Sequence, residues 1–67
     1  MQHLNQKQLI KLAQEVYKDL KDEYGPAVKT RADRVRVLAN VIHNTRYPND
    51  TEFTMEEARS AAERVVK

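Results

Sequence analysis

The longest helical pattern in this sequence is PAVKTRADRVRVLANVIHNTR, residues 26–46, and it lies between two shorter ones. Its apolar residues recur at steps of three and four, which places them on one stripe of an α-helix; they are Val28, Ala32, Val35, Ala39 and Ile42, with Leu38 beside them. Val37 and Val41 form a second, narrower stripe about 150° around the same helix. Because a helix with two apolar stripes is usually covered by two neighbours, we expect it to be the central helix of a three-helix domain.

The start of this central helix has two candidates. Pro26 can occupy the first position of a helix, and Val28 is in phase with the apolar stripe that follows. The other candidate is Thr30, with Asp33 three residues later, and it would leave residues 25–29 in a loop. The phase of Val28 favours Pro26, so we expect a helix over residues 27–45.

Two shorter helical patterns flank the central one. Asn5, with Gln8 three residues later, predicts the start of a helix over residues 6–24. Its main apolar stripe consists of Leu9, Leu12, Ala13, Val16 and Leu20. Thr54 and Glu57 form a capping box that begins a helix over residues 55–66, whose apolar residues are mostly alanines. Small side chains bury little area, so we expect the third helix to be the least stable.

The one clear loop is TRYPNDTEFT, residues 45–54, between the second and third helices. Pro48 keeps Tyr47 away from helical backbone, and Pro-Asn-Asp is typical of a turn. Tyr47 and Phe53 bracket the loop and are expected to fold back on the core, although the pattern leaves open whether either faces inward. The sequence therefore predicts a single all-α domain over residues 1–67: a compact three-helix bundle with a central basic helix and a Tyr-Pro loop before the third helix.

Length and composition limit what the chain can be. A chain of 67 residues buries only about 60% of the surface that it exposes when unfolded, so its core is marginal. It has no cysteine, so no disulfide or thiolate metal site supports that core. No apolar run approaches the ~20 residues needed to span a bilayer, and residues 1–10 do not resemble a signal peptide. We therefore expect a cytoplasmic protein with no membrane partner.

The residue types that carry catalysis are scarce. Ser60 is the only serine, and it lies among alanines on a predicted helix. The two histidines, His3 and His43, are not accompanied by carboxylates in a metal-ligand spacing. A single glycine excludes a glycine-rich phosphate loop. We therefore expect a protein that is not an enzyme, with no catalytic residues, no metal site and no cofactor.

The apolar surface of the first helix is wider than one face can bury. Ile10, Tyr17 and Tyr24 extend its stripe on one flank, and Tyr47 adds an aromatic from the loop. Surplus apolar surface is where protein contacts form. The pattern favours a small, non-enzymatic interaction module, regulatory or accessory, that binds a protein partner or associates with itself through these four residues.

The alternative function is DNA binding through the central helix. Residues 25–46 hold five basic residues against Asp33 alone, a local charge of +4, whereas the whole chain has a net charge of +2. The short junction at residues 24–26 permits a helix-turn-helix arrangement. The phosphate contacts would then come from Lys29, Arg31, Arg34 and Arg36. Against this hypothesis, these four residues are spread around the helix, and the net charge is low for a DNA-binding protein.

Overall fold

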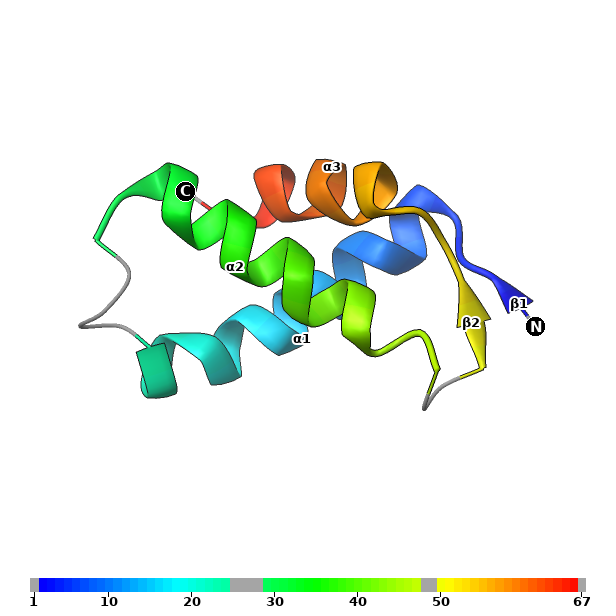
Figure 1. Ribbon diagram of the computed structural model, residues 1–67, viewed down its shortest axis with the longest axis horizontal. Helices are drawn as coiled ribbons and strands as arrows, with labels where there is room; N and C mark the ends of the chain where they lie inside the picture. Colours follow the sequence, from blue (N-terminus) through cyan, green and yellow to red (C-terminus); the bar gives the residue numbers. More distant parts are fainter. Residues whose placement is uncertain (1, 25–28, 48–49, 67) are drawn as a thin grey trace.

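The computed structural model describes residues 2–24, 29–47 and 50–66, apart from the side chains of residues 23 and 24. Three helices form one bundle, with a two-stranded sheet at one end (Figure 1). In chain order the elements are β1 Gln2–His3, α1 Gln6–Tyr24, α2 Arg31–Asn44, β2 Thr51–Glu52 and α3 Met55–Val65. The predicted all-α three-helix bundle is therefore confirmed.

Helices α1 and α3 begin where their capping residues predict. The Asn5 side chain accepts a hydrogen bond from the Gln8 N–H, and the Gln8 side chain accepts one from the Asn5 N–H, both at 2.9 Å. At α3, the Thr54 hydroxyl accepts from the Glu57 N–H at 3.1 Å, and the Glu57 carboxylate accepts from the Thr54 N–H at 2.9 Å. Each reciprocal pair satisfies backbone donors that a helix start leaves without partners.

Helix α2 begins at the second of its two candidate starts. Thr30 has extended backbone, with φ −100° and ψ 157°, and its hydroxyl accepts a hydrogen bond from the Asp33 N–H at 3.1 Å. A helix that ran on from Pro26 would need helical backbone at Thr30, so the expected start at residue 27 is corrected to Arg31. The residues that suggested the earlier start, Pro26 and Val28, lie outside the described residues, as does Gly25.

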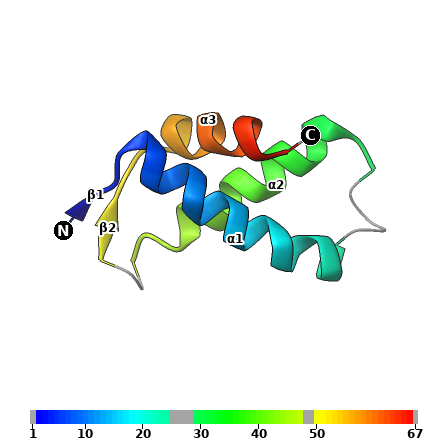
Figure 2. The same ribbon diagram turned by 180° about the vertical axis from the view of Figure 1, so that it is seen from behind.

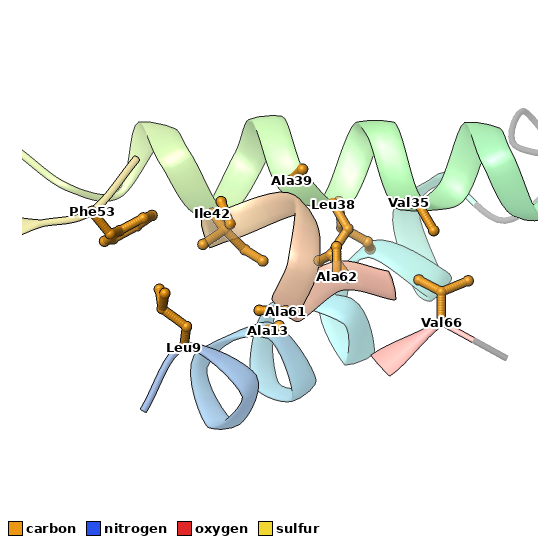
Figure 3. Close-up of a cluster of buried hydrophobic side chains, with 12 residues drawn as sticks. Leu9, Ala13, Val35, Leu38, Ala39, Ile42, Phe53, Ala61, Ala62 and Val66 are labelled. Carbon is orange, nitrogen blue, oxygen red and sulfur yellow. The ribbon is translucent and has the colours of Figure 1, made fainter. Parts of the chain in front are cut away.

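The core lies where the three helices meet, and α3 packs extensively against both α1 and α2 (Figure 3). Helix α3 buries Ala58, Ala61 and Ala62 completely, and these small side chains let it pack closely against the other two helices. Helix α2 buries Val35, Leu38, Ala39 and Ile42. Its second stripe, Val37 and Val41, is half-buried against the same core, whereas Ala32 is exposed.

The loop aromatics take opposite positions. Phe53 is 2% exposed and lies beside Ile42 and Leu9 in the core (Figure 3). Its ring makes a T-shaped contact with the His43 ring, with 6.2 Å between the two centroids. Tyr47 is 74% exposed, with the Arg46 guanidinium 5.2 Å from its ring centroid. The expectation that the aromatics fold back on the core is thus correct for Phe53 and wrong for Tyr47.

A parallel pairing joins the start of the chain to this loop. Gln2 pairs with Thr51 and His3 with Glu52. The N–H groups of Gln2 and Leu4 donate to the carbonyl oxygens of Asp50 and Glu52, at 3.1 and 3.3 Å. Asp50 has a positive φ of 51°, the left-handed conformation that aspartate tolerates in turns. This sheet fixes the start of α1 beside the start of α3, so both helices run away from it while α2 runs towards it (Figures 1 and 2).

Candidate interaction surfaces

The three predicted partner-binding residues whose side chains the structure describes differ in exposure and in position. Ile10 and Tyr17 are half-buried and pack against the core. The side chain of Tyr24, the last residue of α1, lies outside the described residues. Tyr47 is exposed and follows the end of α2 beside the sheet, whereas Tyr17 lies in the half of α1 that is farther from the sheet (Figure 1).

The basic residues of α2 are also divided among different surroundings. Lys29 is exposed and precedes the helix. Arg31 donates from Nη2 to the backbone carbonyl oxygen of Glu63 at 2.8 Å, which ties the start of α2 to the end of α3. Arg36 pairs with Asp33 one turn earlier, at 3.2 Å between Nη2 and Oδ1. Arg34 is half-buried and lies about 160° around the helix from Arg36, so the two cannot face one ligand.

An open groove of about 280 Å³ lies between α2 and α3, and we call it the α2–α3 groove. Its lining consists of Ala32, Asp33, Arg36, Ala39, Asn40, Met55 and Arg59. Ala39 is buried, whereas Met55 is 39% exposed and is one of two large hydrophobic residues exposed in the described part of the chain. One helix contributes Arg36 and the other Arg59, so a guanidinium group stands on each side.

The ion pairs around this groove are exposed and weak. The Arg36–Asp33 pair has side chains that are 73% and 45% exposed. The Arg59–Glu63 pair is 3.8 Å long, with side chains 71% and 53% exposed. Exposed pairs of this kind stabilise a protein by about 0–1 kcal/mol. Both guanidinium groups can therefore exchange their present partners for a carboxylate on another molecule.

A second hollow, of about 370 Å³, lies between α1 and α3 on the other side of α3, and we call it the α1–α3 pocket. Gln14, Tyr17, Lys18, Lys21 and Val65 line it. The Lys21 ammonium lies 5.1 Å from the centroid of the Tyr17 ring, within cation–π range. None of the described residues that line the pocket is acidic, so it is electropositive around an aromatic ring.

The two histidines, His3 and His43, each lie near a charged side chain. Burial lowers the pKa of His43, and the nearby Arg46 lowers it further, which favours the neutral imidazole. His3 Nε2 lies 3.5 Å from Glu57 Oε2. The hydrogen bond from the Thr54 N–H lowers the pKa of Glu57. Among the described residues, no three histidine, cysteine, aspartate or glutamate side chains are grouped to hold a metal ion.

Comparison of this chain with protein-family models, with curated proteins and with solved structures finds no match. No helix in the described ranges is both long and apolar enough to cross a membrane. The function proposed below therefore rests on the geometry of the α2–α3 groove.

Sequence reasoning missed both hollows, although part of the signal was present. Asn40 follows Arg36 by four residues, and Arg59 follows Met55 by four, so each pair occupies one face of its helix. Which faces meet depends on how α2 and α3 are rotated against each other. The four lysines of α1 have a clearer periodicity: together with Gln14 between them, Lys7, Lys11, Lys18 and Lys21 follow at steps of four and three.

Proposed function

We propose that this chain is a non-enzymatic interaction module that binds a helical, acidic segment of a protein partner in the α2–α3 groove. The observation that carries the proposal is the lining of the groove: an apolar base, an exposed methionine and a guanidinium group from each helix. A regulatory or accessory role suits such a module, because that role requires binding of a partner but no catalysis.

A helix is the partner element that this groove favours. Two packed helices leave between them a groove whose length a third helix can follow, with its apolar side chains inserted at helical spacing. Ala39 supplies a shallow apolar base, and Met55 is flexible enough to adapt to the shape of an inserted side chain. A bound helix would thereby cover the hydrophobic area that Met55 now exposes to water.

Carboxylates beside those apolar anchors would complete the recognition. A guanidinium group binds a carboxylate through two parallel hydrogen bonds, which adds direction as well as attraction. Arg36 and Arg59 stand on opposite sides of the groove, so acidic residues on both flanks of a bound helix would each find one. Their present ion pairs with Asp33 and Glu63 are exposed and weak, so exchanging these partners for a carboxylate of the bound helix costs little free energy.

The test is binding of a defined probe: a fluorescein-labelled amphipathic peptide with leucine at helical spacing and glutamate on both flanks. We expect fluorescence anisotropy to show saturable binding, with Arg59→Glu weakening it at least tenfold. Arg64→Glu is the matched control, because it makes the same charge change on an exposed residue of α3 that does not line the groove. Equal weakening by the two variants would contradict the proposal, and so would an equal affinity for the peptide with lysine in place of glutamate.

Self-association is the other mode of protein binding that the sequence predicted. If a second copy occupies the groove, sedimentation velocity will show a dimer that Arg59→Glu dissociates and Tyr47→Ala does not. If the predicted contacts of Tyr47 and Tyr17 form the interface instead, Tyr47→Ala will dissociate the dimer and Arg59→Glu will leave it intact. That second result would assign the interface to the aromatic residues rather than to the groove.

A further inference from the structure

We infer that the α1–α3 pocket and the row of lysines beside it form a second binding surface, whose ligand is single-stranded nucleic acid. A base would lie against Tyr17, and the phosphates would follow the lysines along α1. This inference does not depend on the proposed function, because the α2–α3 groove lies on the other side of α3 and shares no lining residue with the pocket.

The lysines form one continuous row along α1. We call it the lysine row; it consists of Lys7, Lys11, Lys18 and Lys21, with Gln14 in the middle. At 100° per residue all five positions fall within about 40° of a common line, and they span about 21 Å of helix at 1.5 Å per residue. All five side chains are exposed. In the part of the chain that the structure describes, none of the four lysines is paired with a carboxylate.

The length and charge of the row suit a phosphate backbone. A stacked strand advances about 3.4 Å per nucleotide, so the row would follow about six nucleotides. The lysines stand as two pairs, Lys7 with Lys11 and Lys18 with Lys21, about 6 and 4.5 Å apart along the helix, so four of the phosphates along these nucleotides can each meet an ammonium group. The Gln14 amide interrupts the charge at the point where the row meets the pocket, and it can donate to or accept from a base edge.

The pocket supplies what a row of lysines lacks, namely a surface for a base. Tyr17 is half-buried, so the core holds its ring in place, and Val65 adds an aliphatic wall from α3. Proteins that bind single strands combine an electropositive track with an aromatic ring on which bases stack. Lys21 now lies over this ring, but stacking of a base is the stronger interaction, so the ammonium group would move to a neighbouring phosphate.

The surroundings of the row favour a narrow ligand over a wide anionic surface. Glu15, Asp19 and Asp22 are exposed on the flank of α1 next to the row, about 60–120° around the helix from Lys7. A membrane of anionic lipid would bring its charge against these carboxylates as well as against the lysines. Membrane-surface helices also insert protruding apolar side chains, whereas Ile10 and Tyr17 are packed against the core. Duplex DNA keeps its bases stacked, so it offers no base to Tyr17.

The experiment measures anisotropy of a fluorescein-labelled oligothymidylate of about ten nucleotides with the full chain at several salt concentrations. Four phosphate contacts predict a slope of log K against log salt of about −3, and Lys18→Ala should reduce its magnitude by about 0.7. Tyr17→Leu preserves an apolar side chain but removes the aromatic ring, and it should weaken binding about tenfold without changing the slope. Arg36→Ala is the control, since it removes a cation from another surface and should change neither quantity.

Three results of these binding measurements would contradict the single-strand inference. No binding of the oligonucleotide at low salt would overturn the inference, as would an equal loss in Lys18→Ala and Arg36→Ala, which would indicate general charge attraction. Binding to vesicles of phosphatidylserine without binding to the oligonucleotide would assign the lysine row to a membrane and would also overturn the inference.

A substitute variant is Gln14→Glu, for the case that circular dichroism shows Tyr17→Leu not to fold. Gln14 is exposed and needs no core packing, and a new carboxylate in the pocket should repel the strand. Peptide binding in the α2–α3 groove is measured on the same variants, so the two proposals can fail separately.

Discussion

Phe53 and Tyr47 provide a matched pair for testing how the bundle is stabilised. Both are aromatic residues of the same loop, but Phe53 is 2% exposed and Tyr47 is 74% exposed. Removal of a buried phenylalanine typically lowers the free energy of unfolding by about 3–5 kcal/mol. At about 0.05–0.15 kcal/mol per residue, the whole chain would be stable by only about 3–10 kcal/mol. We therefore expect Phe53→Ala to remove at least about a third of the free energy of unfolding.

The effect of Phe53→Ala should spread beyond the loop, because this side chain lies beside Ile42 of α2 and Leu9 of α1 (Figure 3). It therefore holds the sheet end of the bundle to the helices. Tyr47→Ala removes an exposed ring, so it should change the free energy of unfolding by no more than about 0.5 kcal/mol. Phe53→Leu keeps most of the buried volume and should retain the fold, with an intermediate loss.

The assay is urea denaturation followed by far-ultraviolet circular dichroism, with the slope against urea compared among the variants. An unchanged slope with a lower midpoint for Phe53→Leu would show that stability alone has changed. Similar midpoints for Phe53→Ala and Tyr47→Ala would contradict this prediction, because they would mean that burial of Phe53 does not stabilise the fold.

Two further predictions concern local features. Thr54→Ala removes the hydroxyl that accepts from the Glu57 N–H, so it should lower the free energy of unfolding by about 1 kcal/mol, whereas Thr54→Ser should retain most of it; urea denaturation that shows equal losses would contradict a capping role. The pKa of His43 is lower in the folded chain than in the unfolded chain, so the unfolded state binds more protons and stability should fall as the pH drops below about 6.5. Thermal unfolding at several pH values should show this loss in the wild type and a smaller one in His43→Gln; an identical pH dependence of the two melting temperatures would exclude His43 as the cause.

Helix boundaries were predictable where one residue and its near neighbours decide them. The capping pairs Asn5 with Gln8 and Thr54 with Glu57 each complete their hydrogen bonds within a single turn. The start of α2 was harder, because Pro26 and Thr30 are both valid local signals. The phase of Val28 favoured the wrong one, since an apolar residue in phase with a helix need not belong to it.

Candidate interaction residues were less predictable than the helices. Ile10, Tyr17 and Tyr47 were selected because they are apolar and aromatic, but only their neighbours decide how much of each remains exposed. The lysine row could have been found from its spacing of four and three along α1. The groove that Met55 and Arg59 line could not, because its other side belongs to α2 and the rotation of one helix against another has no signature within either.

Local sequence patterns were enough to predict three amphipathic helices, two of their starts and most of the residues they bury, because periodicity and capping act within a few residues. Packing of the whole chain places Phe53 inward and Tyr47 outward, pairs residues 2–3 with residues 51–52, and brings Arg31 to the end of α3. Each of these contacts joins parts of the chain that are distant in sequence or chooses between chemically similar residues. Such choices depend on the combined packing of all three helices, and no local pattern contains that information.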